Sequence, residues 1–183
     1  EGAADAIIAE RTANGPYKDI YDFAQRISFS QVNRKCFESL ALSGGFDSFG
    51  HAREQYFTVA NNQGDLFIDT LIRFGQNYQN AMSEAQNSLF GFDGFNDMID
   101  NPALPASYDK WSTIERLNRE RDLVGIYLSA HPLDDYSFIL NSMCNTGCVE
   151  LGDKPALAQR ENVVFGGIVT NVRSGLSKRG LPY

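Results

Sequence analysis

Residues 32–55 read VNRKCFESLALSGGFDSFGHAREQ, and this stretch decides the fold. A helix is expected first, and its inward side is formed by Val32, Phe37, Leu40 and Ala41. Residues 43–47 then form a tight turn, because the successive glycines Gly44 and Gly45 permit left-handed backbone. A further helix is expected from about residue 50 to residue 60. The stretch is therefore predicted to be a helical hairpin.

A hairpin of this form can bind phosphate, because its short helices and glycine turn can direct backbone N–H groups at an anion. Three turn residues and three nearby cations are the candidate DNA-binding residues: Ser43, Gly44, Gly45, Arg34, Lys35 and Arg53. Asp47 counts against phosphate contact, since an acid repels it. A plain helical hairpin without a ligand is the alternative that these residues leave open.

The flanking sequence predicts more helices. Residues 3–12 have helical spacing and are expected to be the exit helix of a first hairpin lying upstream of Glu1. Asp19 can cap the next helix, whose apolar stripe is Ile20, Phe23, Ala24 and Ile27. A helix from about residue 66 to residue 84 carries Leu71, Phe74 and Tyr78 on one face. These residues are expected to form one helical domain, 1–84.

Residues 85–108 have no lasting period and are predicted to be an exposed linker. The linker carries a Q-x-x-L-F motif, which offers two large apolar side chains to a partner. Its candidate partner-binding residues are Gln86, Asn87, Ser88, Leu89 and Phe90. Residues 63–67 have the same pattern, but they continue into an apolar helical stripe. Leu66 and Phe67 are therefore expected in the core.

The segment 109–160 is predicted to be a helical connector. Ser112 and Glu115 form a capping box, so a helix starts there. Its buried stripe is expected to be Ile114, Leu117, Val124 and Leu128, and residues 131–132 are expected to end it. A shorter helix around residues 134–143 should follow.

Residues 161–183 change character, since 162–173 are rich in β-branched residues with a Gly166-Gly167 kink. We expect a bent first strand, with a hairpin loop over 174–180 and a domain truncated at Tyr183. Arg173, Lys178 and Arg179 are the candidate residues for single-stranded DNA.

Composition limits the function. The 183 residues have a net charge of −7, which weighs against extensive phosphate binding. No apolar run could span a membrane, and no signal peptide is recognisable. Three cysteines, Cys36, Cys144 and Cys148, indicate a reducing compartment and are expected to be small buried thiols rather than zinc ligands. We find no catalytic constellation, metal site or cofactor motif, and Asp134-Asp135 fits the first turn of a helix.

Five blocks, taken in order, resemble the C-terminal part of the alpha subunit of bacterial DNA polymerase III. They are ERTANGPYKDIYDFAQRI, VNRKCFESLALSGGFDSFGHAREQ, QNSLFG, RERDLVGIYLSAHPLDDY and NVVFGGIVTNVRSGLSKRGLPY. The family order is paired helix-hairpin-helix units, a clamp-binding peptide, a helical connector and an OB-fold. Two departures stand out: Asn87 replaces the family's usual Leu or Met, and Asp47 replaces the second glycine of a strong DNA-binding hairpin.

The resemblance implies a mainly α fold: a helix-hairpin-helix domain and a connector, with the first strand of a truncated OB-fold. It implies a part of a replicative polymerase that binds the sliding clamp and positions DNA behind the active site. Mg²⁺-dependent nucleotidyl transfer would belong to another part of the parent. Duplex and single-stranded DNA and other replisome subunits are the remaining expected partners, in the cytoplasm and without a membrane. The alternatives are a helix-hairpin-helix module of a repair enzyme, either a ligase or a nuclease subunit, and a clamp adaptor without DNA contact.

Overall fold

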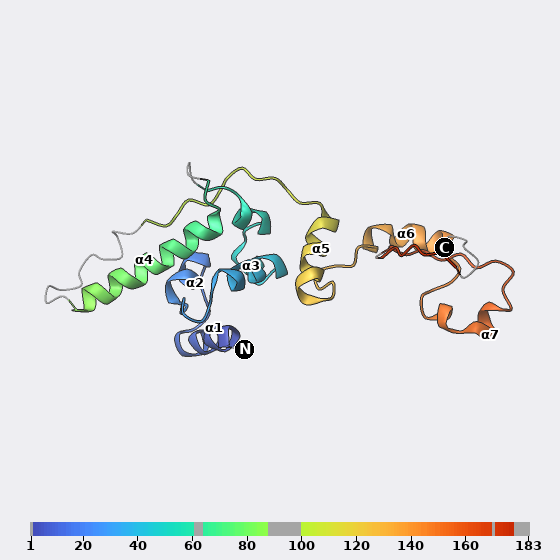
Figure 1. Cartoon of the computed structure of the whole chain (residues 1–183), viewed down its shortest axis with the longest axis horizontal. Coiled ribbons are helices and arrows are strands. Elements are labelled where there is room, and N and C mark those ends of the chain that lie inside the picture. Colours follow the sequence, from blue (N-terminus) through green and yellow to red (C-terminus); the bar gives the residue numbers. More distant parts are fainter. Residues whose placement is uncertain (1, 61–63, 88–99, 170, 178–183) are drawn as a thin grey trace. The chain divides into compact units, whose positions relative to one another are not determined.

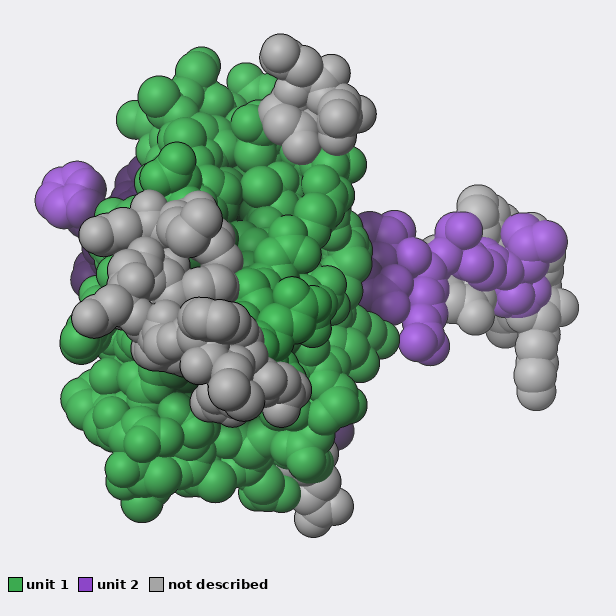
Figure 2. Space-filling view, turned by 90° about the vertical axis from the view of Figure 1, so that its left-hand side faces the viewer, with its two compact units in different colours: residues 1–129 green, residues 130–183 purple. Residues whose placement is uncertain are grey.

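The computed structural model describes residues 2–60, 64–87, 100–169 and 171–177. Over these residues the chain is mainly helical, as expected. It divides into two compact units, residues 1–129 (unit 1) and 130–183 (unit 2), shown in Figure 2. The division falls inside the expected connector, 109–160, and the predicted domain boundaries stay a prediction.

Unit 1 holds most of the helices (Figure 1). In chain order they are α1 (Gly2–Asn14), α2 (Ile20–Arg26), α3 (Arg34–Ser43), the 3₁₀ helices η1 (Asp47–Phe49) and η2 (Arg53–Phe57), α4 (Phe67–Asn87) and α5 (Thr113–Val124). Asp19 caps α2 as expected, because its carboxylate accepts hydrogen bonds from the backbone N–H groups of Tyr21 and Asp22. Asn33 caps α3 in the same way, through the N–H of Cys36.

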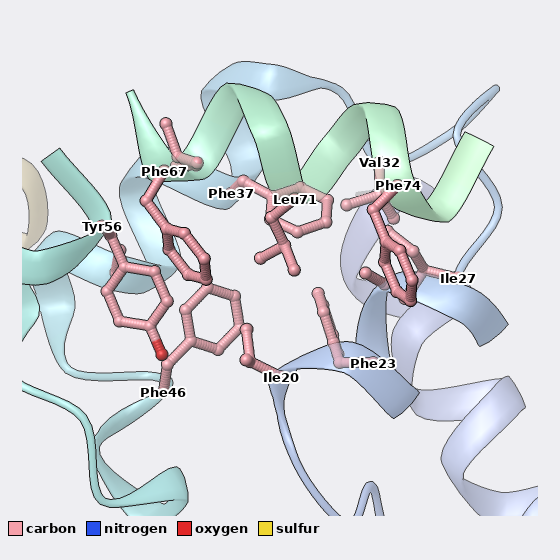
Figure 3. Close-up of a cluster of buried hydrophobic side chains, with 13 residues drawn as sticks. Ile20, Phe23, Ile27, Val32, Phe37, Phe46, Tyr56, Phe67, Leu71 and Phe74 are labelled. Atoms are coloured by element: carbon pink, nitrogen blue, oxygen red, sulfur yellow. The ribbon is translucent and has the colours of Figure 1, made fainter. Parts of the chain in front are cut away.

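The core of unit 1 forms where α4 lies across α2 (Figure 3). Phe67, Leu71 and Phe74 of α4 pack with Ile20 and Phe23 of α2. Ile27, which follows α2 directly, belongs to the same cluster. The two backbones approach closely at Gly75, where a Cβ atom would lie 2.9 Å from the carbonyl carbon of Ala24. Further along α4, the Gln79 side-chain amide donates to the Gln25 and Ile27 carbonyls, at 3.0 and 2.6 Å. Gln79 thereby closes the C-terminal end of α2.

The second Q-x-x-L-F pattern, at residues 63–67, contributes its Leu and Phe to the core. Phe67 is fully buried, and Leu66 packs partly buried against the same cluster. Leu66 also forms an antiparallel bridge with Val59. The expectation that Leu66 and Phe67 are core residues is confirmed, whereas Gln63 lies outside the described residues.

A continuous helix over residues 50–60 is wrong. Gly50 adopts a left-handed conformation (φ 77°) that ends η1, and η2 begins only at Arg53. The Gln55 side chain accepts from the Ala52 N–H and starts this second short turn. Thr58 is extended and leads to the bridge at Val59. The left-handed glycine thus divides the segment into two short 3₁₀ turns.

The helix expected at Ser112 is present, but its buried stripe is mostly wrong. The Ser112 hydroxyl accepts from the Glu115 N–H at 3.2 Å, which confirms the cap. Of the expected stripe only Leu117 is buried, while Ile114, Val124 and Leu128 are about half exposed. The left-handed Gly125 (φ 88°) ends α5 at Val124, before the expected stop at residues 131–132. The helix is therefore short and packs through a narrow face, with α3 as its neighbour.

Unit 2 contains η4 (Asp134–Tyr136), α6 (Ser137–Met143), η5 (Glu150–Gly152) and α7 (Lys154–Leu157). The helix expected around residues 134–143 is thus split into a 3₁₀ turn and α6. No strand is assigned in the described part of 161–183, so the first strand of an OB-fold is not confirmed. Asn145 pairs with Val164, since its backbone N–H donates to the Val164 carbonyl and its side-chain oxygen accepts from the Val164 N–H, both at 2.9 Å.

Candidate functional site

The turn between α3 and η1 is built as a helix end. Gly44 adopts a left-handed conformation (φ 86°) and its N–H donates to the Leu40 carbonyl. The Gly45 N–H donates to the same oxygen at 2.7 Å, and the Ser43 hydroxyl does so at 3.3 Å. Both glycine N–H groups therefore serve to close α3. A phosphate at this turn would need side-chain donors instead.

Arg53 lies beneath this turn and is 5% exposed. Its guanidinium donates to both carboxylate oxygens of Asp47 and to the Leu42 carbonyl at 3.0 Å. It also pairs with Glu120 of α5 at 2.9 Å and donates to the Ser129 hydroxyl at 3.0 Å. The structure thus places this predicted DNA-binding cation inside unit 1, where it is committed to internal partners.

Glu120 is fully buried and completes the cluster. Its carboxylate accepts from the Leu128 and Ser129 N–H groups and from the Ser129 hydroxyl, in addition to Arg53. Burial alone would raise the pKa of Glu120, but the hydrogen bonds from Ser129, Arg53 and Leu128 lower it to about 2. Sequence reasoning missed Glu120, because nothing in the local pattern distinguishes it from the solvated charges around it.

The other two candidate cations lie at the opposite end of α3, roughly 13 Å along the helix from the turn at the usual rise per residue. Arg34 is paired with Glu38 and, at 2.6 Å, with Asp69. Lys35 is exposed and forms no ion pair within the described part of the chain. Of the three cations expected near the turn, Arg53 lies there, whereas Arg34 and Lys35 lie at the other end of α3.

A cation that sequence reasoning did not select lies closer to the turn. Arg11, in the last turn of α1, lines a cavity of about 300 Å³ together with Gly45 and Ser48. No ion pair of Arg11 occurs among the described residues. Its position at the end of a helix, just before Asn14-Gly15-Pro16, was the available signal, since the chain reverses there towards the hairpin.

The Q-x-x-L-F motif begins inside a helix. Gln86 and Asn87 form the end of α4, which runs three residues beyond the expected end at Glu84. Ser88, Leu89 and Phe90 lie outside the described residues. In unit 2, Arg173 is exposed, whereas Lys178 and Arg179 also lie outside the described residues.

The remaining expectations concern metals, thiols and membranes. In the described ranges, no group of three or more His, Cys, Asp or Glu side chains could hold a metal ion. All three cysteines are free thiols, but Cys148 is exposed and Cys36 and Cys144 are only half-buried, so the expected burial is wrong. The helices described here include none with the length and apolarity needed to cross a bilayer.

Comparisons with known proteins identify relatives for almost the whole chain. A family model described as a helix-hairpin-helix motif matches residues 1–56. The chain is 30% identical over 179 residues to the DNA polymerase III subunit alpha of Mycobacterium leprae (97% of this chain, 14% of the relative). It is 32% identical over 176 residues to the subunit of Borreliella burgdorferi (96% and 14%). It is 34% identical over 129 residues to that of Caulobacter vibrioides (70% and 10%).

The chain spans 14% of the length of the first two of these relatives. The match runs through both units, and the helix-hairpin-helix motif coincides with α1 to η2. The resemblance seen in the sequence is confirmed: this chain is a homologue of one segment of the bacterial DNA polymerase III alpha subunit.

Proposed function

We propose that this chain is the part of a replicative bacterial DNA polymerase that attaches to the sliding clamp and positions DNA behind the polymerase active site. The observation that carries the proposal is the match of 97% of the chain to proteins named DNA polymerase III subunit alpha. These names favour the polymerase over a ligase or nuclease subunit. The proposal places the protein in the cytoplasmic replisome and assigns Mg²⁺-dependent nucleotidyl transfer to another part of the parent.

Duplex DNA would be held by few side chains. Arg53 is internally committed and Arg34 is paired, so Arg11 and Ser48 beside the turn and Lys35 at the start of α3 are the supported contacts. With two or three phosphates neutralised in an acidic chain, affinity should lie at the weak end of non-specific binding, roughly 10⁻⁴ M at physiological salt. Attachment to a clamp would compensate, since a tethered second site acts at high effective concentration.

The test is a salt titration of duplex binding. Arg11→Ala and Lys35→Ala should each weaken binding and reduce the slope of log affinity against log salt by about 0.9. Arg73→Ala is the matched control, because it removes the same charge from an exposed residue paired with Asp65 at 2.8 Å. Slopes that are unchanged in the first two variants, or equally reduced in the control, would remove these contacts from the proposal.

The clamp would be bound through Leu89 and Phe90, with Gln86 fixing the peptide by amide hydrogen bonds. Asn87 and Ser88 lie between these contacts and would follow the peptide backbone along the clamp. The double change Leu89→Ala and Phe90→Ala should abolish clamp binding without loss of helicity. The matched control is Phe92→Ala with Phe95→Ala, which removes as much apolar surface from the same segment. If the Leu89/Phe90 variant still binds the clamp and the Phe92/Phe95 variant does not, the clamp contact belongs to Phe92 and Phe95 instead.

Residues 161–183 are proposed to begin an OB-fold that binds single-stranded DNA through Arg173, Lys178 and Arg179. The support is the β-branched, acid-free character of residues 162–183. Changing the three cations to alanine in the polymerase subunit should weaken single-strand binding and flatten its salt dependence. An identical salt slope for both proteins would contradict the assignment.

A further inference from the structure

The Arg53 guanidinium uses every one of its donors. Arginine has five N–H groups, and here they are directed to Asp47, which takes two, and to Leu42, Glu120 and Ser129, which take one each. Leu42 and Asp47 flank the turn that ends α3, so one buried side chain braces both sides of it. Gly44 leaves the space for this, because a Cβ atom there would lie 2.8 Å from the Arg53 Cζ.

The other end of the cluster lies at the point where the chain leaves unit 1. Ser129 is the last residue of that unit. Its N–H donates to Glu120 at 2.7 Å, and its hydroxyl bonds both Glu120 and Arg53. The turn and the exit segment are therefore held by the same two buried charges, although they are more than eighty residues apart in the chain.

We propose that Glu120 and Ser129 are positioning residues that couple the exit segment 128–129 to the turn 42–47 through Arg53. If Ser129 is drawn away from the cluster, a buried guanidinium N–H loses its partner. That loss is costly, so the guanidinium shifts towards new acceptors. Because the same group holds Leu42 and Asp47, the turn must change with it.

The inference deepens the proposed function, because it rests on duplex DNA contact beside this turn. By linkage, a ligand that shifts Ser129 changes the affinity of the turn for DNA. DNA bound at the turn then changes the affinity for that ligand by the same factor. Ala130, the first residue of unit 2, follows Ser129 directly. Events in unit 2 would reach the turn by this route.

The experiment uses the full chain, a fluorescent duplex at low salt and hydrogen exchange. Ser129→Ala removes the hydroxyl but keeps the N–H bond to Glu120, and Glu120→Gln removes the buried ion pair with Arg53 without changing the charge at the surface of the turn. Each change should weaken duplex binding about three- to tenfold. The double variant should be no weaker than the worse single one, because both changes release the same guanidinium. Ser129→Thr, which keeps a hydroxyl, should restore binding.

Hydrogen exchange separates positioning from general loss of structure. In Ser129→Ala the Gly44 and Gly45 amides should exchange at least tenfold faster, while the amides of α4 keep their rates. Glu115→Gln is the control, since it removes a carboxylate from the exposed face of the same helix, where it pairs with Arg119.

Additive losses in the double variant, or unchanged exchange at Gly44 and Gly45, would overturn the coupling. Absence of any duplex binding by the unaltered chain would overturn the proposed DNA contact instead. In that case the exchange rates alone decide whether the exit segment and the turn are coupled.

Discussion

Gly44 and Gly50 share a left-handed backbone but differ in their surroundings. Their φ angles are 86° and 77°; a Cβ at Gly44 would meet the buried guanidinium, whereas nothing lies within 4 Å of one at Gly50. Gly50→Ala should therefore lower the free energy of unfolding only by the cost of holding alanine in a left-handed conformation, about 1 kcal/mol. Gly44→Ala should lower the free energy of unfolding by about 1–3 kcal/mol more, because the Arg53 guanidinium must move and lose some of its hydrogen bonds. Urea denaturation of both variants measures the difference, and equal losses would contradict the tight fit.

Glu120 should make the stability of the chain sensitive to acid. Its pKa falls from 4.5 to about 2 on folding, so the contribution is complete above pH 4.5 and is lost as the pH falls towards 2. The linked free energy is about 3 kcal/mol. The stability gap between the unaltered chain and Glu120→Gln should shrink across this window, as followed by denaturant titration at several pH values. A gap that stays constant would show that the carboxylate does not titrate in this way.

The residue scale is also where sequence reasoning reached its limit at the candidate site. Arg53 was recognised as a cation near the turn, but charge alone carries no information about burial. The acid that decides its role, Glu120, lies 67 positions away. Caps were foreseen at Asp19 and Ser112 because they depend on groups within three residues. Long-range pairing has no such local signature.

At the scale of elements, the crossing of α2 and α4 depends on a missing side chain. Gly75→Ala should raise the helix propensity of α4 but place a methyl group 2.7 Å from the Phe29 ring and 2.9 Å from the Ala24 carbonyl carbon, with the Ala24 carbonyl oxygen closer still. We expect a net loss of about 1–3 kcal/mol. Gln76→Ala, on the exposed side of the same helix, is the control and should be neutral or slightly stabilising. Thermal and urea unfolding would check both, and a stabilised Gly75→Ala would mean that the helices can move apart.

The helices differ in how well their buried faces could be foreseen. The stripes of α2 and α4 were recognised because each lies against a broad apolar neighbour, as Phe67, Leu71 and Phe74 do. The α5 stripe was misjudged because only about one turn of the helix touches the body of unit 1. Leu117 and Glu120 occupy that turn, one apolar and one charged. A buried charge interrupts the periodicity on which the prediction depended.

At the scale of the whole molecule, the two units should differ greatly in local stability. The buried apolar side chains of the described residues all belong to unit 1, while Phe138, Val149 and Val169 of unit 2 are more than three-quarters exposed. Apolar burial supplies most of the driving force for folding, so amides of α2 and α4 should exchange near the global unfolding rate. Amides of α6 and residues 162–169 should exchange orders of magnitude faster. Comparable protection in both units would indicate that unit 2 has a core of its own under solution conditions.

The same contrast explains what the whole sequence could predict. A helical domain was foreseen because its apolar residues are dense and periodic within short distances. The strand expected at 162–173 depends on partners that pair along a ladder, and in the described residues its backbone partner is Asn145 rather than a second strand. Local β preference cannot supply those partners.

The length of α4 sets the distance and the direction at which its C-terminal end leaves the helical core. Past Gln79, where the helix last caps α2, eight more residues extend it by about 12 Å, and Figure 1 shows this end running beyond α2. A partner protein bound just after Asn87 would therefore be held about 12 Å beyond the point where Gln79 caps α2. Removing residues 80–83 would draw it in by about 6 Å while turning it by only about 40° around the helix axis. Adding or removing whole turns of α4 would thus change the distance of a bound partner from the core while leaving its orientation around the helix axis almost unchanged.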